Sequence, residues 1–107
     1  MLAREVLTMS QPEFSAAFKG SPMKRAKLQG LKRNATVVLG NTGTADDVTA
    51  LATALSGEEH LVRAHAAWAL GRIASPAALE ALRARGPVER KPLVLSEIDR
   101  ALARVGA

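Results

Sequence analysis

Apolar residues along the chain recur at spacings of three and four, and no stretch alternates polar and apolar residues for long. Spacings of three and four place side chains on one face of an α-helix, whereas alternation is typical of a β-strand. The pattern therefore predicts a chain that is helical throughout. We expect helices at about residues 2–7, 11–18, 22–39, 45–55, 59–73, 76–85 and 91–104.

Capping residues mark four of the predicted helix starts. A Ser or Thr followed three residues later by an acid has the spacing of a capping box, and a Ser directly before Pro places an N-cap before a first-turn proline. The two boxes are Ser10 with Glu13 and Thr44 with Asp47, and the two Ser-Pro pairs begin at Ser21 and Ser75. We expect helices to stop at glycines, where a left-handed C-terminal residue costs little, namely at Gly20, Gly40, Gly57, Gly86 and Gly106.

The third predicted helix contains a glycine, Gly30. Leu28, Leu31, Ala35 and Val38 nevertheless keep one apolar stripe in register across it. A shared stripe favours a single continuous helix over two short ones.

An internal repeat organises these helices. The segment Leu31–Gly40 aligns with Val62–Gly71, 31 residues later, and Ala69-Leu70 aligns with Ala101-Leu102, 32 residues later. Helix pairs at such a period are typical of an α-solenoid, in which each pair buries its apolar face by stacking on its neighbours. We therefore expect an all-α solenoid of about three helix pairs.

Length and composition agree with one domain and narrow its chemistry. The 107 residues are 48% hydrophobic, enough for one core, and they include no cysteine. A chain without cysteine cannot form disulfides, cysteine-ligated zinc sites, iron–sulfur clusters or thiol nucleophiles. The apolar runs are too short for a membrane span and the first residues lack the pattern of a secretory signal, so we expect a soluble cytoplasmic protein with no membrane partner.

The positive charge is concentrated in one segment. Residues 1–40 contain seven Lys or Arg against two acids, whereas residues 41–107 contain eight of each sign, so the net charge of +5 belongs to the first part. Such asymmetry is typical of a polyanion-binding face. A solvated helix face and a contact to another domain are the alternatives. The candidate nucleic-acid-binding residues are Lys24, Arg25, Lys27, Lys32 and Arg33.

Helical geometry gives these cations an expected arrangement. At about 100° per residue, Arg25, Lys32 and Arg33 fall on one flank of the apolar stripe and Lys27 on the other. We expect Ser21-Pro22, just before them, to cap a helix. The exposed amides of that helix start could also bind a phosphate by donating hydrogen bonds to it.

Other polar residues support no catalytic or metal site. His60 and His65 are the only histidines and no third ligand accompanies them. His65 shares a helical stripe with Trp68, so we expect packing between repeats, and we expect Trp68 to fill core space rather than to stack on a base. The paired acids Asp46, Asp47, Glu58 and Glu59 stand at helix starts, where they favour the helix dipole. Asn41 follows Gly40 and is expected in a turn.

Two family resemblances follow from these residues. Residues 46–75 resemble HEAT-like repeats of the short bacterial kind, with Val48, Leu51 and Leu55 along a first helix and a second helix rich in alanine. A sharper resemblance lies in FKGSPMKRAKLQGLKRNATVVLGNTG, Phe18 to Gly43, which is similar to the signature that opens the C-terminal domain of bacterial epoxyqueuosine reductases. That signature reads F-x-G-S-P-x-K-R-x-(K/R)-x-x-G-L-x-R-N and then L-G-N-x-G.

The second resemblance implies a function. Full-length members of the family are enzymes that depend on iron–sulfur clusters and cobalamin and reduce epoxyqueuosine to queuosine at the wobble position of tRNA. This chain lacks the cysteines of those clusters, so the resemblance implies a non-catalytic C-terminal domain without a cofactor of its own. Its implied role in queuosine biosynthesis is to bind or scaffold tRNA, with the anticodon stem-loop as partner and a cluster- and cobalamin-bearing catalytic domain as a possible second one. The alternative is a protein-interaction module that docks an acidic partner or that catalytic domain.

These observations divide the single domain, residues 1–107, into four expected parts. They are an N-terminal helical lead-in over 1–20, the basic helix over 21–43, a repeat over 44–74 and a C-terminal repeat over 75–107.

Overall fold

The structure, a computed structural model, describes residues 3–10, 12–13, 16 and 25–106. In this part of the chain the secondary structure is entirely helical, which confirms the all-α prediction. The α-helices are α1 (Ala3–Thr8), α3 (Arg25–Thr42), α4 (Val48–Leu55), α5 (His60–Ile73), α6 (Pro76–Arg85) and α7 (Pro92–Gly106). Two 3₁₀ turns, η1 (Ala45–Asp47) and η2 (Gly86–Val88), precede α4 and α7.

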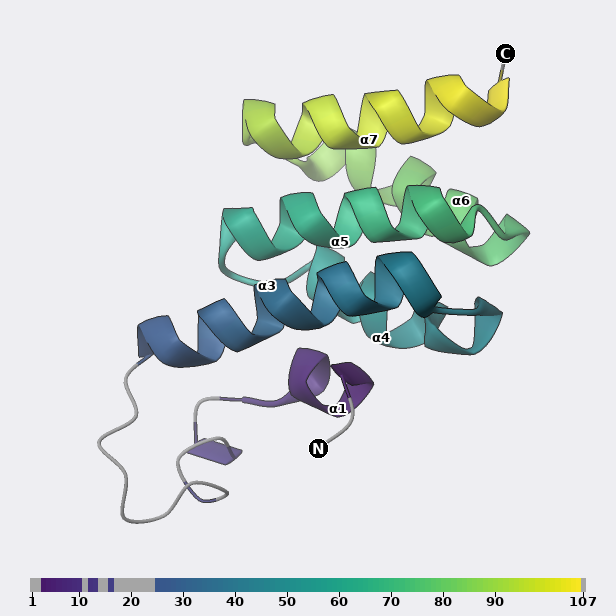
Figure 1. The fold of residues 1–107 in the computed structure, drawn as a ribbon. Helices are drawn as coiled ribbons and strands as arrows, with labels where there is room; N and C mark the ends of the chain where they lie inside the picture. Colours follow the sequence, from purple (N-terminus) through teal and green to yellow (C-terminus); the bar gives the residue numbers. More distant parts are fainter. Residues whose placement is uncertain (1–2, 11, 14–15, 17–24, 107) are drawn as a thin grey trace.

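The helices form two stacked layers. One layer consists of α3, α5 and α7, which lie side by side and run in the same direction, and α4 and α6 lie behind it (Figure 1). The central helix α5 packs against α3, α4, α6 and α7. Helix α1 packs against α3 and α4 at the N-terminal end of the stack. The predicted solenoid of about three helix pairs is therefore present, as α1 with α3, α4 with α5 and α6 with α7.

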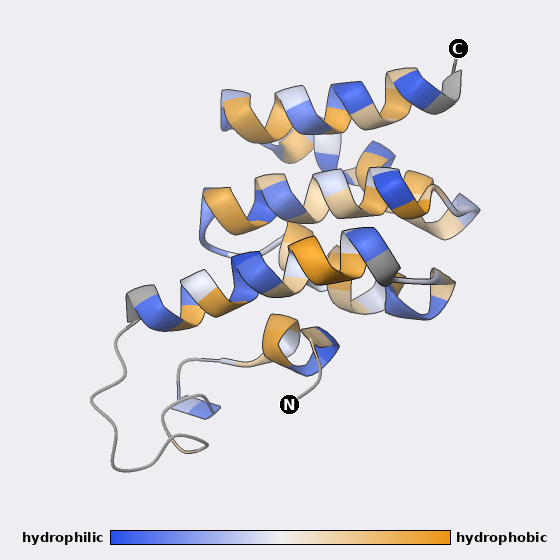
Figure 2. Cartoon of the chain, viewed as in Figure 1, coloured by the Kyte–Doolittle hydropathy of each residue, from blue (hydrophilic) through white to orange (hydrophobic). Residues whose placement is uncertain are grey.

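Small side chains let the central helices approach closely. Ala66, Ala67 and Ala69 of α5 have no exposed surface, and an added Cβ at Gly71 would overlap Ala101 of α7. Buried hydrophobic residues of the packed helices form one core, and each helix carries both hydrophobic and polar residues along its length (Figure 2). The alanine-rich sequence of α5 thus sets the spacing of the stack.

The capping predictions hold wherever the structure describes them. The Ser10 and Glu13 backbone amides each donate to the other's side chain, at 3.1 and 3.3 Å. The Thr44 amide donates to Asp47 at 3.0 Å, and a capping box is present there. Ser75 caps α6 by accepting from the Ala78 amide at 3.2 Å. The Ser21-Pro22 cap lies outside the described residues.

The glycine stops are confirmed in part: the helix continues through Gly40, and the left-handed conformation expected at Gly86 is not observed. Helix α3 continues through Gly40 and Asn41 to Thr42, so neither the stop at Gly40 nor the turn at Asn41 is observed. Gly40 is needed for another reason, because an added Cβ there would overlap the Trp68 ring. Gly86 is right-handed and Gly106 lies within α7, whereas the left-handed cap of α5 is Ala74, with φ of 53°. Three helices nevertheless end where expected, since Gly57 follows the end of α4, Gly86 is the C-cap of α6 and α7 ends at Gly106, while Gly20 lies outside the described residues.

Helix α3 is continuous across Gly30, as predicted, but its buried face is turned from the expected stripe. Leu28 and Ala35 are buried, whereas Val38 is 51% exposed and Thr36 is fully buried. The Thr36 hydroxyl donates to the Arg33 carbonyl at 2.6 Å, which satisfies it inside the core. This rotation of the buried face brings Lys32 toward the packed side of α3, because both α1 and α5 contact the helix.

Candidate nucleic-acid interface

The five predicted cations do not share one environment. Lys24 and the side chain of Arg25 lie outside the described residues. Lys27 is exposed, while Lys32 and Arg33 are both half-buried on different sides of α3. The expected single flank formed by Lys32 and Arg33 is therefore not observed.

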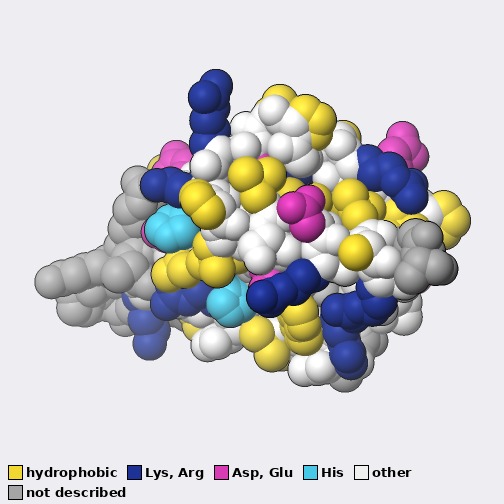
Figure 3. Space-filling view, turned by 90° about the horizontal axis from the view of Figure 1, so that it is seen from above, with side chains coloured by type: hydrophobic (Ala, Val, Ile, Leu, Met, Phe, Trp, Pro, Cys, Tyr) yellow, Lys and Arg dark blue, Asp and Glu magenta, His cyan; other side chains and the backbone are white. Residues whose placement is uncertain are grey.

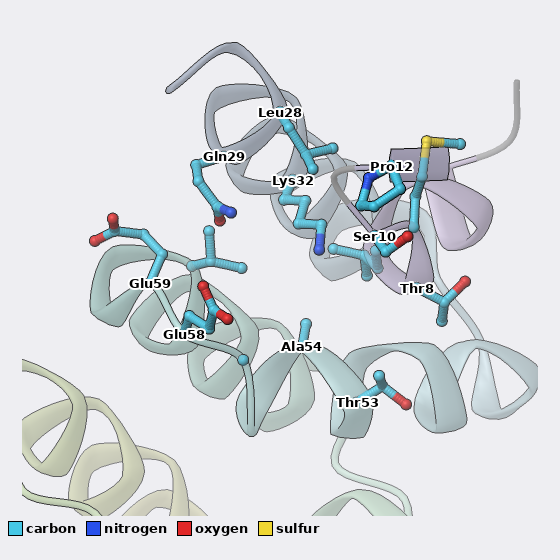
Figure 4. Close-up of a pocket in the computed structure, with 14 residues that line it drawn as sticks. Thr8, Ser10, Pro12, Leu28, Gln29, Lys32, Thr53, Ala54, Glu58 and Glu59 are labelled. Carbon is cyan, nitrogen blue, oxygen red and sulfur yellow. The ribbon is translucent and has the colours of Figure 1, made fainter. Parts of the chain in front are cut away.

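Lys32 enters a cavity of about 390 Å³ between α1, α3, α4 and the turn before α5, which we call the Lys32 cavity (Figure 4). Glu58 and Glu59 line the same cavity. Burial lowers the pKa of Lys32, and the nearby Glu13 carboxylate opposes that effect. Lys32 thus shares the N-terminal end of the stack with Glu58 and Glu59 in the cavity lining and with Glu13, the acid that affects its pKa.

A second hollow of about 460 Å³, the Trp68 groove, lies across α3, α5 and α7. Its walls include Val37, Leu61, Trp68 and Leu93. Val37 is 39% exposed, Leu61 36% and Leu93 47%. The face that the three parallel helices present to solvent is therefore apolar at its centre.

Cations surround this apolar centre. The Arg72 guanidinium lies 5.7 Å from the centroid of the Trp68 ring, and its Nε donates to the Gly40 carbonyl at 3.4 Å. Arg33 lies close enough to His65 to lower the pKa of that imidazole. Arg100 pairs with Glu97 at 3.4 Å. Seen from above, Lys and Arg side chains alternate with apolar side chains and a histidine along the lower edge of the molecule (Figure 3).

Three polar side chains, Asn41, His65 and Glu97, also line the Trp68 groove. The His65 Nδ1 lies 3.1 Å from the Leu61 carbonyl, which can only accept, so Nδ1 carries the proton. Burial lowers the pKa of His65 first, Arg33 lowers it further, and Glu97 raises it. The neutral ring therefore leaves Nε2 as an acceptor.

The predicted roles of His65 and Trp68 are confirmed only in part. Trp68 packs against the core, as expected, and its ring closes over Gly40, but it also forms a wall of the groove. His65 is half-buried and faces the groove rather than an interior contact between repeats.

Sequence reasoning missed the groove, although the repeat contains a signal for it. Val37 and Trp68 are 31 residues apart, and Leu61 and Leu93 are 32 apart, so apolar residues recur at equivalent repeat positions. They lie on the side of each helix that faces away from the second layer. Large apolar side chains repeated on a solvent-facing stripe indicate an interaction surface.

The structure also contains a buried ion pair that no local spacing predicts. Arg63 donates from Nε and Nη2 to the Glu89 carboxylate at 2.8 and 3.1 Å, and from Nη1 to the Gly57 and Glu58 carbonyls. Two backbone amides and Arg85 also donate to Glu89. Burial raises the pKa of Glu89, but its hydrogen bonds and the charge of Arg63 prevail and hold it at about 2. This pair fastens α5 to the turn before α7.

Two of the four acids at helix starts, Asp47 and Glu59, serve as caps. Asp47 completes the capping box and lies 3.2 Å from Arg4 Nε, and Glu59 accepts from the Leu61 amide. In the described residues, no group of three or more His, Asp or Glu side chains is placed to hold a metal ion. Within the same ranges, no helix has the length and hydropathy that crossing a bilayer requires.

Comparisons with known proteins agree with this geometry. The profile of a family described as HEAT repeats matches residues 24–103. The crystal structure of epoxyqueuosine reductase with a tRNA-Tyr epoxyqueuosine-modified tRNA stem loop is similar over 99% of this chain, with a TM-score of 0.83 and 25% identity. The structure of selenomethionine-labeled epoxyqueuosine reductase is similar over 95% of it, with a TM-score of 0.78 and 25% identity. No curated protein sequence matches the chain significantly.

The chain corresponds to 28% of each reductase chain. The resemblance to the helical-repeat part of these reductases is thereby confirmed.

Proposed function

The chain belongs to the HEAT-repeat family, and from this premise we propose that it is a tRNA-binding or scaffold domain of an epoxyqueuosine-reductase-like protein. In this role it serves queuosine biosynthesis by holding the anticodon stem-loop while a separate catalytic domain modifies the wobble base. The observation that carries the proposal is the similarity of 99% of the chain to part of a reductase crystallised with a tRNA stem loop.

The charge distribution supplies the mechanism. Helix α3 contains four cations and no acid, and Lys24 directly precedes it. We infer that Lys24, Arg25, Lys27 and Arg33 contact backbone phosphates and orient the stem-loop, whereas Lys32, the fifth predicted cation, lines the Lys32 cavity and contributes less. Contacts of this kind position an RNA without reading its sequence, and they weaken as salt displaces the protein cations.

The chemistry itself belongs to another part of the system in this proposal. This chain has no cysteine, and it corresponds to 28% of the matched reductases. A catalytic portion that carries iron–sulfur clusters and cobalamin is therefore the second partner, and the chain alone is not an enzyme.

Binding to an anticodon stem-loop tests the proposal. We expect the double variant Arg25→Glu, Arg33→Glu to weaken affinity at least about tenfold, because two phosphate contacts become repulsions. Fluorescence anisotropy of a labelled stem-loop, measured at several salt concentrations, gives the affinity. The matched control is Arg83→Glu, Arg90→Glu, which makes the same charge change at exposed positions on α6 and before α7.

Equal weakening by both double variants, or an affinity that does not depend on salt, would contradict the proposal. The alternative, a module that docks an acidic protein or the catalytic portion, predicts that the Arg25 and Arg33 variant loses that protein while RNA binding is unchanged.

A further inference from the structure

The Trp68 groove has the size and lining of a site for a small flat ligand. Its volume of about 460 Å³ falls in the range of small-molecule sites, and its walls are apolar with a few polar groups between them. Val37, Leu61 and Leu93 leave much of their surface exposed although they sit together on one face. Such an exposed apolar cluster on a small domain indicates a binding site for a ligand or a partner.

The polar groups of the groove match the edge of a nucleobase. The Nε2 atom of neutral His65 accepts, the Glu97 carboxylate accepts, and the Asn41 amide both donates and accepts. The N–H groups of a base edge need such acceptors. Proteins that read single-stranded RNA combine these groups with an aromatic or guanidinium plane against which the base stacks.

The charges around the groove match a phosphate backbone. Arg33 lies beside His65, while Arg72 lies over Trp68 at the other end of the same helix face. A base between them would place its flanking phosphates near a cation on either side.

A protein segment fits the groove less well. Stable protein interfaces bury about 800 Å² on each partner. The exposed apolar surface of the groove rests on three aliphatic side chains and the half-buried Trp68, which is far less extensive than a helix-binding groove needs.

We propose that the Trp68 groove binds an unpaired nucleobase of the RNA, stacked among Trp68, Val37 and Leu61 with its edge toward His65 and Glu97. This inference rests on the proposed function, since it assigns one site within the RNA-binding surface. It adds a base contact to the phosphate contacts of α3. The domain then distinguishes a loop with an unstacked base from a plain duplex.

Trp68 provides a direct signal, because it is the only tryptophan in a chain without tyrosine. Two RNAs are titrated into the full chain: an anticodon stem-loop, and the same stem-loop with abasic loop nucleotides, which keeps every phosphate. Anisotropy reports total binding, and tryptophan fluorescence reports the groove. We expect the intact loop to quench Trp68 and to bind roughly tenfold more tightly than the abasic loop.

A matched pair of variants guards against effects on folding and charge. Val37→Asp places a carboxylate at the groove, and Val88→Asp makes the same change at a valine that is 60% exposed in η2, outside the groove. We expect Val37→Asp to remove the preference for the intact loop and Val88→Asp to preserve it.

The possible outcomes separate this inference from the function on which it rests. Absence of binding by anisotropy overturns the RNA-binding function and the base site with it. Equal affinity for both loops without quenching overturns the base site and leaves the phosphate contacts standing. A change in Trp68 fluorescence caused by the catalytic portion of a reductase, with none caused by RNA, assigns the groove to a protein and also overturns the base site.

Discussion

Two groups of cations in this chain occupy opposite environments. Arg63 and Arg85 converge on Glu89, whose side chain has no exposed surface, and almost every donor of the Arg63 guanidinium is used inside the protein. The cations of α3 have no acid on their own helix, and Lys27 is exposed. The same residue types hold two helices together in one region and remain available to a partner in the other. Burial and the position of acids decide between these roles, not the residue type.

The strongest way to break this comparison is to remove the acid of the first group. We expect Glu89→Gln to lower the free energy of unfolding by about 3–5 kcal/mol, because it leaves the Arg63 guanidinium buried without a counter-charge. Urea unfolding followed by circular dichroism measures the change. Glu80→Gln on the exposed side of α6 is the control, and a loss below about 1 kcal/mol for Glu89→Gln would contradict the assignment.

Lowering the pH provides a second test of the group formed by Arg63, Arg85 and Glu89. The pKa of Glu89 is lowered from 4.5 to about 2, so the folded state favours its ionised form. Its contribution of about 3 kcal/mol is fully present above pH 4.5 and is lost as the pH falls from about 4.5 toward 2. Unfolding free energies measured across this range should decline less in Glu89→Gln than in the unmodified chain, and parallel declines would contradict the prediction.

Two glycines of α3, the helix that carries the second group of cations, differ in the space around them, and one of them contacts Trp68 of the groove. An alanine at Gly40 would overlap the Trp68 ring, so we expect Gly40→Ala to cost about 1–3 kcal/mol of stability. The nearest atom to a Cβ at Gly30 is Arg33 Nη2 at 3.8 Å, and Gly30→Ala should stabilise the chain by about 0.5–1 kcal/mol. Urea unfolding compares the two, and effects of the same sign would show that Trp68 does not require Gly40.

The smallest expected effect separates two adjacent cations within the second group. Lys32 points into a cavity lined by Glu58 and Glu59, whereas Arg33 lies near the Trp68 groove. We expect Arg33→Gln to reduce the slope of log affinity against log salt by about 1, and Lys32→Gln to change it by much less. Stem-loop titrations at graded salt give both slopes. Equal reductions would place both side chains on phosphates.

Much of the fold could be predicted because its determinants are local. Helix periodicity and the 31-residue repeat led to a stack of helix pairs. The capping boxes at Ser10 and Thr44 were predicted because each box closes within four residues, and the box at Thr44 led to the correct helix start. The helix ends were predicted less well. A rule based on local sequence predicts a helix end at Gly40. The residue is instead glycine because the Trp68 ring of another helix occupies the space that a Cβ would need.

The candidate site was predicted at the level of the segment rather than of the individual side chain. A cluster of cations on α3 is a property of composition and was evident at once. The separation of Lys32 from Arg33 was not, because the buried face of α3 depends on contacts with α1 and α5. The groove needs side chains from three helices, so no single stretch of sequence contains it.

The sequence by itself determined that this chain is helical, repeated, free of cysteine and basic in its first forty residues, since these properties depend on residue type and spacing alone. Tertiary structure decided which cations are used internally and which remain available. It joined Arg63 to Glu89 across 26 residues and assembled the Trp68 groove from α3, α5 and α7. The physical reason is that burial and charge pairing depend on distances between helices, and those distances are set only when the helices stack.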